Sequence, residues 1–164
     1  MLRSTLELLL TRELGAVRRE LEAYPDDASV WRSAPGVPNT GGTLALHVAG
    51  NIQHFFGGIL GGDGYKRDRD AEFARRDVSR MELLAGIDAA IASVKRTLPL
   101  LNDATLAAPY PEPIAKRTVC TRDFVVHLVS HLSYHLGQLD YHRRMVTGDP
   151  KGVDAVSVRE LPEL

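Results

Sequence analysis

Apolar residues recur at intervals of three and four along much of this 164-residue chain. The first such run consists of Leu6, Leu10, Leu14, Val17, Leu21 and Tyr24. This spacing places the side chains on one face of an α-helix. No stretch of useful length alternates apolar and polar residues as a half-buried strand does. The pattern therefore predicts an all-α protein whose helices pack side by side.

The second expected helix runs from Leu44 to about Leu60. Thr43 suits its N-cap, because a threonine hydroxyl accepts a hydrogen bond from a backbone N–H of the first turn. Gly61 and Gly62 suit its end. The link that follows, residues 61–78, is long for a simple antiparallel turn. We expect a crossover that runs back along the bundle, which allows the second and third helices to be parallel.

Ser79 and Glu82 have the form of a capping box, which predicts the start of a third helix. Its apolar stripe is Leu84, Ile87, Ile91, Val94, Leu98 and Leu101. A fourth helix is expected to begin at Thr118 or Thr121 and to end at Gly148. Residues 1–164 are thus predicted to form one domain, a four-helix bundle with a long crossover between helices two and three.

Composition excludes several classes of partner. The net charge of −1 does not suggest the positively charged surface that binds nucleic acid. No apolar run approaches the ~20 residues of a membrane-spanning helix. Glu7 and Glu13 among the N-terminal leucines do not fit a signal peptide. The single cysteine, Cys120, suits a reducing compartment, so we expect a cytoplasmic protein. Cys120 is either a reactive thiol at a helix start or an inert, half-buried residue.

Four of the six histidines lie on one stripe of the fourth expected helix. They are His127, His131, His135 and His142, and they span about 80° of its circumference. The spacing of the apolar residues places His131 and His135 on the core-facing side of the helix, where imidazole rings that bind no metal need hydrogen-bond partners. His47 and His54 lie on the second helix. Imidazoles that project from facing helices commonly bind metal in a bundle, although an i, i+4 pair is also common as a hydrogen-bonded surface pair.

Two segments carry a family resemblance. They are Leu-Ala-Leu-His-Val-Ala-Gly-Asn, which contains His47, and Ser-His-Leu-Ser-Tyr-His-Leu-Gly-Gln, which contains His131 and His135. They resemble the DinB/YfiT-like superfamily of metal-dependent four-helix-bundle proteins, in which a histidine early in helix two accompanies a His-x-x-x-His pair in helix four. The resemblance covers nearly the whole chain and points to an uncharacterised branch. It implies a homodimer that holds a divalent metal through His47, His131 and His135. Nickel and zinc are the ions we expect.

The resemblance also implies thiol-dependent transferase chemistry, because characterised relatives use low-molecular-weight thiols such as bacillithiol, mycothiol or glutathione. Three neutral imidazoles leave an ion its full charge and an open position, which suits activation of a thiol or a water. A metal-dependent hydrolase and a non-catalytic, stress-related metal-binding dimer stay open as alternatives. The chain lacks His-Glu-x-x-His, which argues against a metalloprotease.

Further residues are expected near the histidines. Gln138, Asn51 and Tyr134 are candidates to hold the second ring nitrogens of the metal ligands, although Gln138 also fits a surface amide. His127 is a candidate extra ligand. We expect His54 and His142 to be core or surface histidines with ordinary hydrogen-bond partners.

A substrate mouth is expected beside the metal. Arg67 and Arg69 belong to a charged run that is either a solvated connector or an arginine cluster that orients a small anionic substrate. Trp31, before the loop that leads to His47, either walls the pocket or packs against the fold.

Overall fold

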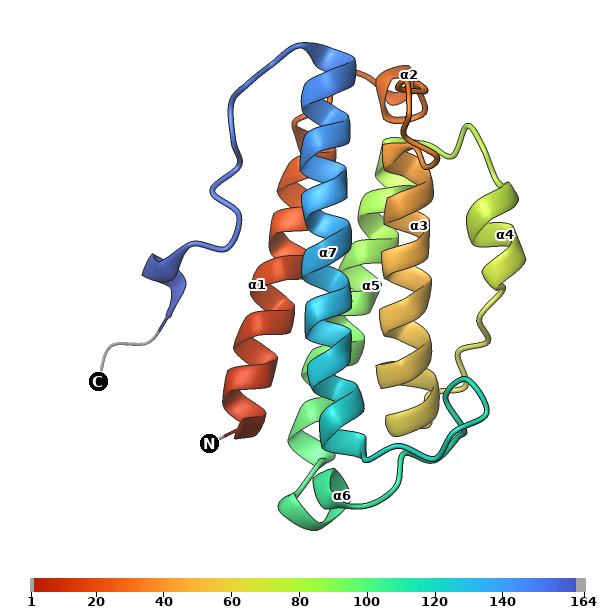
Figure 1. Ribbon diagram of the computed structural model, residues 1–164, viewed down its shortest axis with the longest axis vertical. Coiled ribbons are helices and arrows are strands. Elements are labelled where there is room, and N and C mark those ends of the chain that lie inside the picture. The colour runs from red at the N-terminus through yellow and green to blue at the C-terminus, as the bar shows by residue number, and fades with distance from the viewer. Residues whose placement is uncertain (1, 162–164) are drawn as a thin grey trace.

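The structure is a computed structural model that describes residues 2–161. Its regular elements within that range are helices, with isolated bridges but no strand, so the all-α prediction is confirmed. Four long helices lie side by side in Figure 1: α1 (Leu2–Glu22), α3 (Gly41–Ile52), α5 (Arg80–Thr97) and α7 (Thr121–Thr147). Short helices occupy the connections: α2 (Asp27–Val30), α4 (Arg69–Ala74) and α6 (Asp103–Ala107). No helix in the described range has the length and apolar content needed to cross a membrane.

The chain direction shows the expected crossover. In Figure 1, α1 and α7 run upward, whereas α3 and α5 both run downward. The connection from α3 to α5 therefore climbs back along the outside of α3, and it carries α4 on the way. At its upper end, Trp31 Nε1 donates a hydrogen bond of 2.9 Å to the carbonyl of Val78. This topology makes α3 and α7 antiparallel neighbours.

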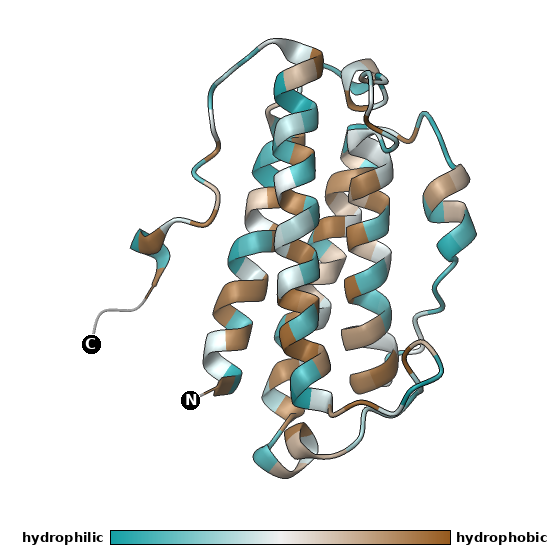
Figure 2. Ribbon diagram, viewed as in Figure 1, coloured by the Kyte–Doolittle hydropathy of each residue, from teal (hydrophilic) through white to brown (hydrophobic). Residues whose placement is uncertain are grey.

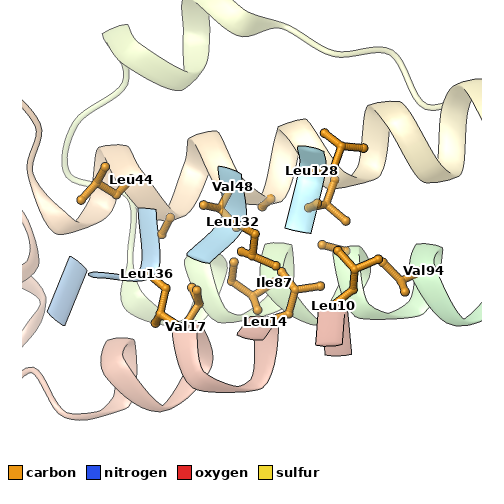
Figure 3. Close-up of a cluster of buried hydrophobic side chains, with 14 of the residues drawn as sticks. Leu10, Leu14, Val17, Leu44, Val48, Ile87, Val94, Leu128, Leu132 and Leu136 are labelled. Carbon is orange, nitrogen blue, oxygen red and sulfur yellow. The ribbon is translucent and has the colours of Figure 1, made fainter. Parts of the chain in front are cut away.

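The core lies between the four long helices. Its buried side chains include Leu10, Leu14, Val17, Leu44, Val48, Ile87, Val94, Leu128, Leu132 and Leu136, which Figure 3 shows in one cluster. Figure 2 shows the apolar segments concentrated on the long helices, whereas the crossover is largely hydrophilic. Burial of each large apolar side chain contributes roughly 1.5–3 kcal/mol, so this cluster dominates the stability of the bundle.

The start of α3 differs from the prediction. Its N-cap is Thr40, whose hydroxyl accepts from the Thr43 amide at 3.3 Å, so the assignment of Thr43 was wrong by one turn. Gly41 and Gly42 are the first two residues of the helix, and Tyr24 packs against Gly41 and Trp31 against Gly42. A Cβ atom would lie 2.4 Å from each of these two side chains. His47 consequently lies in the second turn of α3. The helix then continues as a π-helix, Gln53–Leu60.

The other helix ends are closer to expectation. The Ser79 hydroxyl accepts from the Glu82 amide at 3.2 Å, as predicted for the start of α5, although Leu83 rather than Leu84 is buried. Cys120, rather than Thr118 or Thr121, occupies the N-cap of α7 and forms no side-chain cap there. Cys120 is half-buried, and its thiol donates to the Leu106 carbonyl at 3.3 Å.

The segment after α7 is mostly irregular and ends with a 3₁₀-helix, Val158–Glu160. Arg19 Nε donates to the Val153 carbonyl at 3.0 Å, and Arg143 Nη2 donates to the Lys151 carbonyl at 2.5 Å. The Arg143 guanidinium is fully buried and pairs with Glu20. These contacts hold the segment to α1 and α7.

Candidate metal centre

Three histidines from two helices converge. His47 comes from α3, whereas His131 and His135 lie one turn apart on α7. The Nε2 atom of His131 is 3.1 Å from Nε2 of His135 and 3.5 Å from Nε2 of His47. One ligand nitrogen from each ring lies within 4.8 Å of the other two. The antiparallel packing of α3 against α7 thus brings together the three residues predicted from the sequence.

Two of the three nitrogen–nitrogen separations match those around a small divalent ion, and the third is within 4.8 Å. Nitrogens about 2.0–2.1 Å from a tetrahedral zinc ion are about 3.4 Å apart, and the two short separations bracket that value. His131 Nε2 can donate a hydrogen bond to only one of its neighbours, whereas a cation can accept a lone pair from all three rings. A metal ion can therefore bind all three ring nitrogens at once, whereas a proton cannot.

The electrostatic environment also disfavours protonation of the rings. Burial, together with the neighbouring His135 and His47, lowers the pKa of His131 to about 4. Burial likewise lowers the pKa of His135, against the opposing effect of its hydrogen bond with Gln138. Neutral imidazole is the form that binds a metal. At neutral pH, both residues present that form.

The predicted phase of α7 needs a correction. His131 and His135 are half-buried, whereas Leu128, Leu132 and Leu136 occupy the core-facing line. The two histidines lie beside that line, so the predicted core-facing positions of α7 were wrong by about one residue. Their position at the edge of the core leaves the rings accessible from a cavity.

That cavity has a volume of about 400 Å³. The three histidines form part of its lining, together with Asn51, Asn39 and Arg67. Its remaining walls are mainly aromatic and aliphatic, and they include Phe55, Phe73, Ile114 and Phe124. An open side of the histidine group therefore faces a space large enough for a small molecule.

Two of the three predicted neighbours, Gln138 and Tyr134, contact the ligand His135. Gln138 Oε1 is 2.7 Å from His135 Nδ1, so Nδ1 donates and Nε2 keeps its lone pair for the centre. Asn51 is buried one turn after His47, and its Oδ1 has no hydrogen-bond partner in the described part of the chain. Tyr134 packs its ring edge-on against His135 but is 64% exposed. Of the three, only Gln138 forms a hydrogen bond with a ligand among the described residues.

Sequence reasoning missed Glu72. This carboxylate is buried on α4, and its Oε2 accepts from His47 Nδ1 at 3.0 Å. Arg67 donates to both Glu72 oxygens, at 2.6 and 2.8 Å. Burial acts to raise the pKa of Glu72, but the hydrogen bonds from Arg67 and His47 outweigh it and lower that pKa. The charged run that contains Glu72 gave no sign that one of its acids would be buried.

The two arginines of the expected mouth have different surroundings. Both line the cavity. Arg67 is engaged by Glu72, whereas the Arg69 guanidinium lies 5.0 Å from the centroid of the Phe73 ring, over its face. Arg69 has no acidic partner among the described residues. Arg69 is therefore the arginine whose charge is available at the cavity.

The remaining candidates lie at or beyond the edge of the centre. His127 lines the cavity and stacks on Phe124 but is not part of the group of three. His54 Nε2 is 3.2 Å from Glu112, away from the three. Trp31 is absent from the lining, and its ring instead packs over Gly42. Of the two alternatives for Trp31, the structure therefore agrees with packing against the fold, because Gly42 at the start of α3 leaves space for the indole.

His142 is a core histidine, as expected. Its Nδ1 is 2.7 Å from the Tyr24 hydroxyl, and its Nε2 donates to the Arg32 carbonyl at 2.9 Å. Both ring nitrogens are thereby used, so His142 has no free lone pair for a metal.

Comparison with known proteins agrees with this geometry. The family model described as the DinB superfamily matches residues 9–139, a range that contains His47, His131 and His135. No curated protein matches the chain. Because the matched range covers well over half of the sequence, the chain belongs to the DinB superfamily.

Proposed function

We propose that His47, His131 and His135 hold one divalent ion, nickel or zinc, and that the protein is a metal-dependent enzyme. The observation that carries this proposal is the convergence of three ring nitrogens, within 4.8 Å of one another, on the wall of a cavity of about 400 Å³. Metal sites with three protein ligands and an open position are typical of catalysis, whereas structural sites are closed by four.

The reaction we propose transfers a low-molecular-weight thiol, of the bacillithiol, mycothiol or glutathione type, to a small electrophile. A divalent ion held by His47, His131 and His135 would supply positive charge that lowers the pKa of a thiol bound beside it. The thiol sulfur forms a bond to the electrophilic carbon, a leaving group departs with its electron pair, and the thiol proton goes to solvent. Because all three imidazoles are neutral, they would leave the ion its full positive charge.

The cavity residues supply binding and orientation. Arg69 places a positive charge at the cavity, which suits a carboxylate or another anion on the substrate or the thiol. Phe55 and Phe124 give the wall apolar surface that packs against the uncharged part of the ligand and excludes water. Gln138 keeps His135 in the tautomer whose Nε2 points to the centre.

Two assays on the same metal-loaded preparation test the reaction. The first follows conjugation of monochlorobimane with bacillithiol, mycothiol or glutathione, and the second follows hydrolysis of an activated ester without thiol. We expect metal-dependent turnover in the first assay only. Turnover confined to the second identifies a metal-dependent hydrolase. Retention of metal with no turnover in either assay supports a non-catalytic, metal-binding role.

A further inference from the structure

The crossover between α3 and α5 is attached to the bundle by an acidic side chain. Of residues 61–79, only Glu72 and Val78 are buried. Val78 lies next to the start of α5, whereas Glu72 lies on α4, in the middle of the crossover. A cavity of about 390 Å³ lies beneath this segment, with residues of α3, α4 and α5 in its walls. The middle of the crossover is therefore held by polar contacts rather than by a continuous apolar layer.

Those polar contacts end at a ligand of the proposed metal. Arg67 and Glu72, both from the crossover, form a bidentate pair, and Glu72 then accepts from His47 Nδ1. Phe73 packs its ring 5.1 Å from the His47 ring. Arg67 Nη2, which can only donate, lies 3.3 Å from Nδ1, but the Glu72 carboxylate, which can only accept, is closer at 3.0 Å. The hydrogen is therefore on Nδ1, and the lone pair of Nε2 faces the centre. The crossover thus determines which nitrogen of His47 is available.

α3 is shaped to receive the Glu72 carboxylate. A Cβ atom at Gly50 would lie 2.1 Å from Glu72 Oε1 and 2.8 Å from Glu72 Cδ. Gly50 lies in a helix, where alanine is intrinsically more favourable. The absent side chain at Gly50 therefore leaves the space that the carboxylate occupies, one turn from His47.

We propose that Glu72 is a positioning residue for His47 and that docking of the crossover is coupled to metal binding. The proposal rests on the metal site described under the proposed function. A carboxylate behind a ligating imidazole fixes the tautomer and increases the basicity of the ligand. Because such coupling is reciprocal, bound metal must also hold the crossover more firmly against α3.

Two variants test the coupling by different routes. Glu72→Gln removes the charge behind His47. Gly50→Ala retains every donor and acceptor but displaces the carboxylate, and the displaced atom is the end of a flexible side chain, so the fold can accommodate it. The affinity for Zn²⁺ is measured by competition with a chromophoric chelator. We expect each variant to bind zinc roughly 10–100-fold more weakly than the unchanged protein.

Two matched controls lie near the same helices. Asp88→Asn removes an equal charge from the exposed Arg18–Asp88 pair, which joins α5 to α1 and does not involve the crossover. Gly86→Ala adds a methyl group in ordinary contact, 3.5 Å from the Ala49 Cβ. Both controls should bind zinc as tightly as the unchanged protein. Circular dichroism at the assay temperature verifies that each variant is folded.

Hydrogen exchange distinguishes this coupling from a purely structural role of Glu72, because a structural role would not make exchange depend on zinc. Added Zn²⁺ should slow exchange of the α4 backbone amides, Arg69–Ala74, in the unchanged protein, and this protection should be lost in Gly50→Ala. If Glu72→Gln fails to fold, the zinc affinity of Gly50→Ala and the exchange experiment still test the coupling. Equal zinc affinity in Gly50→Ala and no zinc-dependent protection of α4 would overturn the coupling. A protein that binds no zinc at all would instead overturn the proposed function.

Discussion

The charge of Arg69 is the residue-scale feature that most directly bears on substrate choice. Arg67, two positions earlier, donates to Glu72, whereas Arg69 lies over Phe73 at the cavity wall. Both belong to the same charged run, and their spacing gave no basis for assigning them different roles. The distinction depends on the burial of Glu72, which only the packed crossover reveals.

Removal of the Arg69 charge should weaken substrate binding. We expect Arg69→Ala to raise the KM for an anionic substrate by about 10-fold, because a hydrogen bond to a charged group contributes about 1.5–3 kcal/mol. The metal content should stay the same. Steady-state kinetics and elemental analysis check the two expectations. Arg122→Ala, which removes an exposed arginine paired with Asp123, is the control. An unchanged KM in Arg69→Ala would remove the residue from the substrate site.

His142 gives a prediction about stability and pH. Burial lowers its pKa, against the opposing effect of its hydrogen bond to the Arg32 carbonyl. In the unfolded chain, the ring takes up a proton as pH falls through about 6.5, whereas the folded ring stays neutral to lower pH. Its contribution to stability is therefore fully present above about pH 6.5 and is lost as pH falls below it.

Replacement of His142 should remove that part of the pH dependence. Between pH 6.5 and 5, the free energy of unfolding of His142→Gln should fall less steeply than that of the unchanged protein, by up to about 1.4 kcal/mol per pH unit. Urea denaturation at several pH values measures both slopes. Parallel slopes would mean that His142 takes up its proton equally in the folded and unfolded states.

At the scale of elements, apolar periodicity predicted the four long helices but not every boundary, and the length of one link predicted the crossover. The long link after Gly61 allowed parallel second and third helices, which a short turn cannot connect. Gly41 and Gly42 indicated a loop, although Tyr24 and Trp31 require small residues at helical positions there. His131 and His135 were identified as a pair from their spacing, whereas Glu72 was not, because its partner His47 is 25 residues away in sequence.

The glycines at the start of α3 allow this packing argument to be tested. Gly42→Ala would place a Cβ 2.4 Å from the Trp31 ring, and such overpacking destabilises by about 1–3 kcal/mol. Gly137→Ala in α7 meets nothing within 4 Å and should be neutral or stabilising by up to about 1 kcal/mol. Thermal denaturation of the two variants gives the comparison. Equal melting temperatures would show that the indole moves aside without cost.

For the whole molecule, we propose a homodimer, as the family resemblance implies. The outer face of α7 carries exposed apolar side chains, among them Tyr134, Tyr141 and Met145, at 64%, 68% and 51% exposure. Exposed apolar residues at helical spacing are suited to a contact between two copies. The face lies close to the histidines, because Gln138 lies on it and contacts His135.

Light scattering at micromolar concentration tests the oligomeric state. We expect twice the chain mass of 18.0 kDa for the unchanged protein. Tyr141→Glu should shift the population toward the monomer, because a buried, unpaired charge strongly disfavours association. A mass of 18.0 kDa for the unchanged protein would contradict the dimer.

The measurement that tests the central claim most directly is elemental analysis of the purified protein after saturation with zinc or nickel and removal of free ion. The unchanged protein should retain one ion per chain, and so should His142→Ala, whose ring nitrogens face Tyr24 and Arg32. His131→Ala should retain none, because His131 Nε2 lies between those of His47 and His135. One ion per chain in His131→Ala would contradict the assignment of the three histidines as the metal site.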